Sequence, residues 1–264
     1  MYIEITHDYD VKEVAKDIRS FCFRDDITVK DFIALVEELE PERYLELFYR
    51  NVLENVKGEL PDDLVELLLT SQLTVGHIIG SCKVSDAMVQ NIIDNRLREV
   101  DSEKLISTQN LTFEQFETVL KNGSDIYTSS LGSMLGDLRN VEYALYVIDN
   151  WDQIPSIADE DIAEFRYYLF NGFGSVLLSD EECLKLFGFV RPAFSSEELR
   201  EHEPCTEGWK RAYKWAGRSD TKYTWNEFIA RHILANQNNV EGAKSDLEWL
   251  AESLSDEQDY FDHW

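Results

Sequence analysis

One pattern recurs along this chain and marks where helices should begin: an apolar residue, then Ser or Thr, then three residues and a second apolar side chain. It occurs at Ile27-Thr28…Phe32, Leu73-Thr74…Ile78, Val84-Ser85…Val89, Leu111-Thr112…Phe116, Leu178-Ser179…Cys183 and Tyr223-Thr224…Phe228. In such a pattern the hydroxyl caps the first helical turn, and the two apolar side chains pack together as a hydrophobic staple. In three copies Gln115, Glu182 or Glu227 completes a capping box. The pattern predicts six capped helices and a mainly α fold.

Few residues interrupt these helices, because the 264-residue chain contains only five prolines and twelve glycines. From Val11 onward the apolar positions follow helical spacing, and only Tyr2–Thr6 alternates in the manner of a short strand. With 44% hydrophobic residues, a chain of this length can bury a sizeable core. No run of eighteen apolar residues occurs, so we expect no membrane-spanning helix.

Longer matches suggest that some of these helices belong to repeats. Residues 68–74 match residues 105–112 with one insertion, and residues 150–156 give a third, degraded copy. Stacked helix pairs in an irregular solenoid would explain the matches, and so would the simple reuse of good caps. The segments resemble short helical-repeat proteins of phages and large DNA viruses, in which a Trp and an Ile-Ser pair close one helix and Leu-Ser/Thr opens the next. This resemblance covers about residues 60–185 and implies a scaffold, not an activity.

The composition changes after the segment 189–192, where aromatic residues become frequent. Five of the six tryptophans lie beyond it, at Trp209, Trp215, Trp225, Trp249 and Trp264. We therefore expect a helical-repeat domain over 1–190 and an aromatic-rich helical domain over 191–264.

Acidic residues dominate the charge: 52 Asp and Glu stand against 25 Lys and Arg, which gives a net charge of −27. Phosphate contacts need Lys and Arg, so this balance argues against direct binding to nucleic acid or to an anionic membrane. The four cysteines are scattered, and the first residues lack the basic and apolar stretches of a signal peptide. We expect free buried thiols and a cytoplasmic protein, or one in the host cytosol if a phage encodes it.

No signature of catalysis stands out. The segment 171–175 is glycine-rich but lacks the spacing and the Lys of a phosphate-binding loop, and it suits a helix end and turn. His202 and Cys205 lie within metal reach of each other, but no second pair follows. We therefore expect no enzyme, no cofactor and no metal.

The acidic excess is concentrated between residues 141 and 182, where ten acids face a single base, Arg166. Carboxylates near a helix start stabilise the helix dipole, which explains part of the set but not the missing Lys residues. The ten acids are predicted to form a partner-binding acidic face. They are Glu142, Asp149, Asp152, Asp159, Glu160, Asp161, Glu164, Asp180, Glu181 and Glu182.

The charge reverses between residues 208 and 222, where bases and aromatic residues alternate. Three interpretations stay open: stacking on nucleic acid, pairing with acidic neighbours or a second subunit, and one helix with an aromatic inner face and a basic outer face. The candidate residues for a secondary contact or oligomer surface are Trp209, Lys210, Arg211, Lys214, Trp215, Arg218 and Lys222.

Rows of carboxylates on a rigid helical scaffold can imitate the phosphates of a nucleic acid and compete for a basic groove. The leading hypothesis is therefore a non-catalytic inhibitor, encoded by a phage or mobile element, that engages a basic host protein or nucleoprotein complex. Acidic anti-restriction and anti-CRISPR proteins are similar in character. The alternative is a scaffold that binds through its aromatic C-terminal region, with the charge serving solubility. A homodimer is compatible with both.

Overall fold

The computed structural model describes residues 3–5, 10–23, 26–69, 73–124, 126–155, 157, 162–202 and 204–255. Within these ranges the chain is mainly helical, with sixteen α-helices and six very short strands. The predicted mainly α fold is confirmed. The contacts divide the chain into two units, Met1–Asp125 and Ile126–Trp264.

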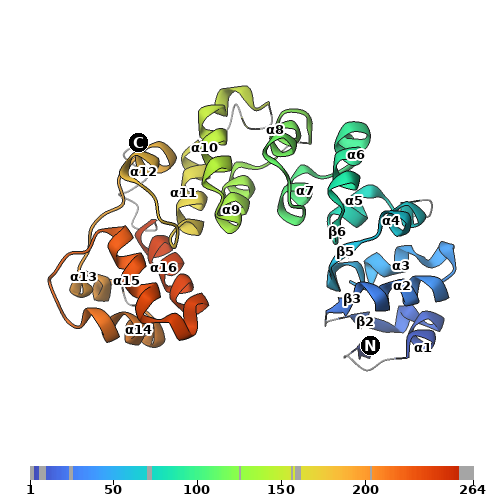
Figure 1. Ribbon diagram of the computed structural model, residues 1–264, viewed down its shortest axis with the longest axis horizontal. Coiled ribbons are helices and arrows are strands. Elements are labelled where there is room, and N and C mark those ends of the chain that lie inside the picture. Colours follow the sequence, from blue (N-terminus) through green and yellow to red (C-terminus); the bar gives the residue numbers. More distant parts are fainter. Residues whose placement is uncertain are drawn as a thin grey trace. The chain divides into compact units, whose positions relative to one another are not determined.

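The first unit alternates short strands with helices (Figure 1). Its strands are β1 (Ile3–Ile5), β2 (Phe21–Phe23), β3 (Ile27–Thr28), β4 (Val56–Lys57), β5 (Glu59–Leu60) and β6 (Lys83–Val84). Its helices are α1 (Val11–Lys16), α2 (Val29–Glu38), α3 (Leu45–Tyr49), α4 (Asp62–Leu69), α5 (Val75–Ile79), α6 (Asp86–Arg96), α7 (Ser102–Thr108) and α8 (Phe113–Asn122). Short 3-10 turns occupy Ile18–Ser20, Pro41–Arg43, Leu53–Asn55 and Leu97–Glu99.

The described strands pair two by two, and each pair is parallel: β1 with β2, β3 with β4, and β5 with β6. Parallel strands need a crossover between them, and helices supply it in every case. The strand expected over Tyr2–Thr6 is present as β1, while both ends of the expected range lie outside the described residues.

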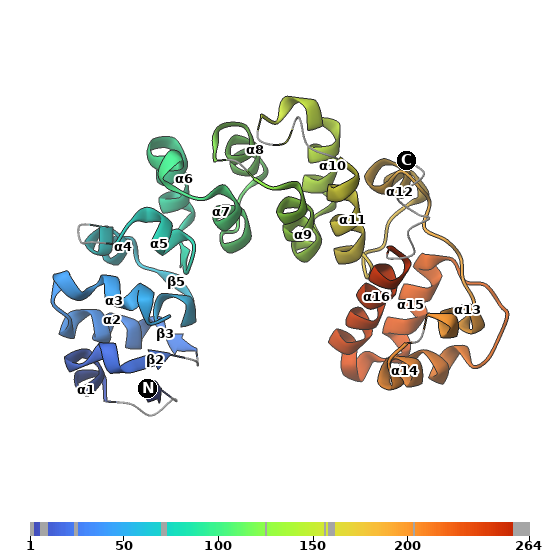
Figure 2. The same cartoon turned by 180° about the vertical axis from the view of Figure 1, so that it is seen from behind.

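The second unit is built from helices α9 (Thr128–Leu138), α10 (Val141–Asp149), α11 (Ile162–Gly172), α12 (Asp180–Phe187), α13 (Ser196–Glu201), α14 (Thr206–Ala216), α15 (Trp225–Ala235) and α16 (Val240–Ser255). Two 3-10 turns, Trp151–Gln153 and Gln237–Asn239, connect some of them. Helices α14, α15 and α16 pack against one another, and the view from behind shows the same group (Figure 2).

All six predicted caps are confirmed. The hydroxyls of Thr28, Thr74, Ser85, Thr112, Ser179 and Thr224 each accept a hydrogen bond from the backbone N–H three residues later. The capping boxes of Gln115, Glu182 and Glu227 are present as predicted. The apolar partners of the staples are buried in four copies, as with Ile27 and Phe32 at 5% and 0% exposed.

The two best-matching segments both join consecutive helices. Residues 68–74 connect α4 to α5, and residues 105–112 connect α7 to α8. In the second segment Gln109 is buried, and its amide Nε2 donates to the carbonyl oxygens of Ile79 (2.9 Å) and Cys82 (2.8 Å). Its Oε1 accepts from the backbone N–H of Val84 at 3.2 Å. One side chain thus ties the end of α5 and strand β6 to the end of α7. The solenoid interpretation stays a prediction.

Helices α9 and α11 cross in backbone contact because glycines line the crossing. A Cβ added to Gly132 would lie 2.6 Å from the carbonyl oxygen of Phe165, and one added to Gly172 would lie 2.6 Å from the carbonyl carbon of Gly136. Real Cβ atoms do not approach backbone atoms this closely, so only glycine fits.

The boundary predicted near residue 191 lies inside the second unit. Arg191 is 6% exposed and donates from Nη1 to the carbonyl oxygens of Phe173 (3.2 Å) and Val176 (2.9 Å). Its Nη2 donates to Asn226 Oδ1 on α15 at 3.1 Å. This buried guanidinium joins α15 to the turn after α11. The segment 171–175 is the helix end and turn that its sequence suggests.

Candidate functional site

The described members of the predicted acidic face fall into two groups. Glu142, Asp152, Asp180 and Glu181 are exposed, and within the described chain none of them has a cationic partner. We call these four the open carboxylates. Glu142 lies in the first turn of α10, and Asp180 and Glu181 lie in the first turn of α12. Because α10 packs against α12, the open carboxylates come from neighbouring segments.

The remaining described members are engaged within the chain. Asp149 Oδ2 accepts from Lys185 Nζ at 2.6 Å, which links α10 to α12. Glu164 Oε2 accepts from the hydroxyl of Thr128 at 2.7 Å. Hydrogen bonds from the backbone and hydroxyl of Ser179 lower the pKa of Glu182 in the capping box of α12. Asp159, Glu160 and Asp161 lie outside the described residues.

The cations of the basic segment are largely neutralised by the protein itself. Lys210 Nζ pairs with Glu207 at 2.7 Å, and Lys222 Nζ pairs with Glu198 at 2.7 Å. Lys214 Nζ donates to the carbonyl oxygen of Ala235 at 3.0 Å. Both Lys214 and Arg218 are exposed. This placement favours pairing with acidic neighbours and an amphipathic helix, and the oligomer surface stays a prediction.

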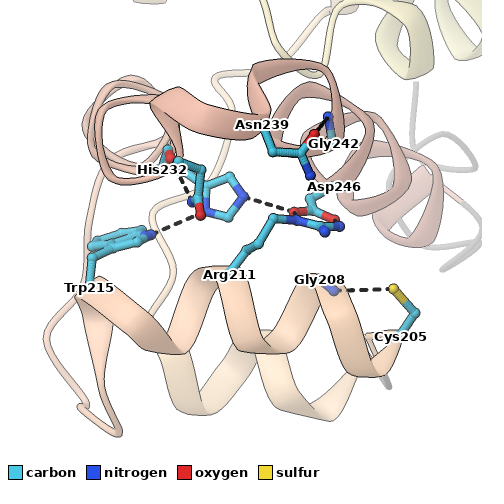
Figure 3. A network of polar contacts seen from close by, with 9 residues as sticks. Cys205, Gly208, Arg211, Trp215, His232, Asn239, Gly242 and Asp246 are labelled. Carbon is cyan, nitrogen blue, oxygen red and sulfur yellow. Dashed lines mark hydrogen bonds and ion pairs between the residues drawn. The ribbon is translucent and has the colours of Figure 1, made fainter.

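Arg211 belongs to a polar network that joins α14, α15 and α16 (Figure 3). Its Nε donates to Asp246 Oδ2 and its Nη2 to Asp246 Oδ1, both at 2.6 Å. His232, 1% exposed, contacts Asp246 Oδ2 through Nε2 at 3.0 Å. The indole N–H of Trp215 reaches His232 Nδ1 at 3.1 Å. The carboxylate of Asp246 thus binds both the guanidinium of Arg211 and the imidazole of His232, between the three helices.

The network fixes which nitrogen of His232 carries the proton. An indole N–H can only donate, so Nδ1 accepts and the proton of the neutral ring lies on Nε2, from which it is donated to Asp246. Both ring nitrogens are therefore engaged, and neither is available as a base or a metal ligand. This pairing leaves no local sign in the sequence, because His232 and Asp246 stand fourteen residues apart on different helices.

Burial alone would raise the pKa of the Asp246 carboxyl, but hydrogen bonds from Arg211 and His232 outweigh it and hold the pKa below its ordinary value. A carboxyl group whose pKa is lower in the folded than in the unfolded protein stabilises the fold at pH values above its ordinary pKa. This stabilisation is lost as the pH falls through the pKa of the folded state. In urea unfolding followed by Trp emission, the stability difference between the protein and Asp246→Asn should stay constant above about pH 4 and shrink below it. A difference that already shrinks between about pH 7 and pH 5 would contradict this assignment.

Beside the network lies a hollow of about 220 Å³, with apolar walls that include Leu199, Phe228 and Trp249. Cys205 lies at its edge as the exposed N-cap of α14, where its Sγ accepts from the N–H of Gly208 at 3.3 Å. Cys82 and Cys183 are free buried thiols as predicted, and burial raises the pKa of Cys82 to about 12.

Neither a metal centre nor a membrane span emerges from the described residues. Among them, no three His, Cys, Asp or Glu side chains come together in a way that could hold a metal ion. No helix in that part of the chain combines the length and apolar character needed to cross a bilayer. In comparisons with known proteins, no family model matches the sequence, and no curated protein or solved structure matches the chain.

Proposed function

We propose that this chain is a non-catalytic protein that binds a basic, nucleic-acid-handling surface of a partner through the open carboxylates of α10 and α12. The observation that carries the proposal is the contrast between the two charged segments of the second unit. The basic segment is largely paired within the chain, whereas Glu142, Asp152, Asp180 and Glu181 are exposed and have no cationic partner in the part of the chain that the structure describes.

Unpaired surface charge favours association with an oppositely charged partner. The chain has 25 Lys and Arg and a net charge of −27, so each carboxylate that is not paired with one of these cations adds to the repulsion between acidic groups. A basic partner removes that repulsion and is drawn to the surface by long-range attraction, which accelerates binding. A partner that normally holds phosphates offers the densest set of cations, so competition with nucleic acid follows from the charge. A phage-borne or mobile-element inhibitor of host defence is the corresponding biological role.

The mainly helical fold is compatible with the same proposal, because capped helices can serve as a scaffold. Helix starts fixed by side-chain caps give short helices with defined ends, and such helices hold their first-turn carboxylates in place. Carboxylates that are already held in place lose little conformational entropy when a partner binds them.

Neutralising the four open carboxylates should weaken capture of the partner at least about fourfold, since each exposed ion pair contributes about 0.2–1 kcal/mol. The immobilised protein is incubated with extract of the native host, and bound proteins are quantified at about 50 mM and about 500 mM NaCl, where screening differs strongly. Capture should fall steeply at the higher salt. The variant combines Glu142→Gln, Asp152→Asn, Asp180→Asn and Glu181→Gln.

A matched control removes the same number of charges from the first unit, at residues that are also exposed. It combines Glu37→Gln, Glu40→Gln, Glu54→Gln and Glu66→Gln. The control should capture the partner as the unaltered protein does, and added nucleic acid should displace that partner. Capture that is insensitive to salt, or equally weakened in both variants, refutes the proposal.

The alternative scaffold that binds through its aromatic C-terminal region receives less support. Trp225 is 2% exposed and donates its indole N–H to the carbonyl oxygen of Gly174 at 2.9 Å. The indole of Trp215 is committed to His232. Both rings therefore serve the interior of the second unit, which leaves half-buried Trp209 and Tyr213, 47% exposed, as the aromatic surface of α14.

A further inference from the structure

The crossing of α9 and α11 leaves an open groove, which α16 borders on a further side. The groove measures about 400 Å³, and Gly136 and Gly172 contribute to its lining. Gly136 is buried and its backbone contacts Gly172, so at this point the groove is lined by backbone and not by side chains.

The walls of the groove combine aromatic rings with carboxylates. Tyr168 of α11 is 37% exposed, and Trp249 of α16 is half-buried. Asp137, Glu248 and Glu252 supply three carboxylates, and Asp137 is exposed at the last turn of α9. The lining is therefore net acidic and offers two π faces.

One guanidinium already occupies the edge of this groove. Among the described residues that line it, Arg139 is the only cation, and it forms an ion pair with Glu248. Arg139 adopts a left-handed conformation, with φ 51° and ψ 34°, which is unfavourable for a residue other than glycine. From this position at the end of α9, the guanidinium of Arg139 reaches Glu248, one of the three carboxylates of the groove.

We infer that the groove receives a cationic side chain, an arginine in preference to a lysine, from the basic partner; the inference rests on the proposed function. A planar guanidinium stacks on aromatic faces and bonds carboxylates in a fork geometry, and both kinds of group line this space. Partial enclosure strengthens such contacts relative to those made by carboxylates on an open surface. The groove therefore adds a specific anchor to the general attraction of the open carboxylates.

The test uses N-acetyl-L-arginine amide, with the neutral isostere N-acetyl-L-citrulline amide as its control, in a titration of ¹⁵N-labelled protein followed by NMR. The arginine compound should shift the Trp249 indole signal and the amide signals of Gly136 and Gly172 in a saturable way. The citrulline compound should leave them in place. Equal shifts with both compounds, or shifts scattered over surface carboxylates without the groove, overturn the inference.

Two substitutions in the groove test whether the arginine compound binds there. Asp137→Asn and Tyr168→Phe should each weaken the arginine titration, the first by about three- to tenfold and the second by less than about threefold, since the phenyl ring retains its π face. Asp152→Asn, which removes an open carboxylate outside the groove, should leave the titration unchanged. A loss with Asp152→Asn equal to that with Asp137→Asn contradicts a specific anchor.

The experiments distinguish a wrong groove inference from a wrong proposed function. If partner capture depends on the open carboxylates but not on Asp137, the groove inference is wrong and the proposed function stands. If arginine binds in the groove but neutralising the open carboxylates leaves partner capture intact, the proposed function is wrong and the anchor stands.

Discussion

Replacing Gly172 by alanine is expected to destabilise the second unit by about 3 kcal/mol or more. The new Cβ would lie 2.6 Å from the carbonyl carbon of Gly136 and 3.0 Å from its oxygen. These are backbone atoms, so α9 and α11 would have to move apart and lose the packing along their crossing. All six tryptophans stand at residue 151 or later, so Trp emission during urea unfolding reports on the second unit alone.

Gly76→Ala is the matched control for helical glycine. A Cβ at Gly76 would lie 3.4 Å from the carbonyl oxygen of Glu99, which is an ordinary contact. Gly76 lies in the first unit, so its variant is followed by far-UV circular dichroism. This change should be neutral or should stabilise the first unit by up to about 1 kcal/mol, because alanine favours the helix. A Gly172→Ala variant with an unchanged urea midpoint would mean that the two helices do not cross as closely as described.

Replacing Gln109 by leucine is expected to cost the first unit about 3 kcal/mol. Leucine fills a similar volume, but the carbonyl oxygens of Ile79 and Cys82 and the N–H of Val84 would lose their bonds to this side chain. Each buried polar group left without a partner costs about 1–3 kcal/mol. The first unit contains no tryptophan, so its unfolding appears in far-UV circular dichroism and not in Trp emission.

Gln90→Leu serves as the comparison, because Gln90 is exposed and, among the described residues, bonds to the side chains of Asp94 and Gln115. Its effect should be about 1 kcal/mol, because one amide, that of Gln115, loses its acceptor here, whereas Gln109→Leu affects several backbone groups. The Trp emission transition should be unchanged in both variants. Equal destabilisation by Gln90→Leu and Gln109→Leu would contradict the inference that the buried amide of Gln109 stabilises the first unit.

The helix starts could be predicted because their signals are local. A hydroxyl such as Thr112 and its partner Gln115 are three residues apart, so the sequence contains the whole interaction. The strand pairs could not be predicted in the same way. Strands β3 and β4 have two residues each, too few to show alternation, and Ile27 pairs with Val56 far along the chain.

The charged segments could be located from composition, but the state of each charge could not. Asp149 and Glu182 look alike in the sequence, yet one binds Lys185 across two helices and the other caps its own helix. The groove depends on a contact between Gly136 and Gly172, which stand thirty-six residues apart. The spacing of Gly132 and Gly136, four residues apart on α9, was its one local sign.

The capped helices have a consequence for biosynthesis. The cap of a helix start such as Thr28 and Asp31 needs no distant residue, so it can form as soon as that short segment leaves the ribosome, and the short helix becomes stable once it packs. Each parallel pair of the first unit closes when its later strand emerges, and the last of these, β6, ends at Val84. The first unit can therefore assemble vectorially during translation, while the acidic and aromatic segments of the second unit are still being synthesised.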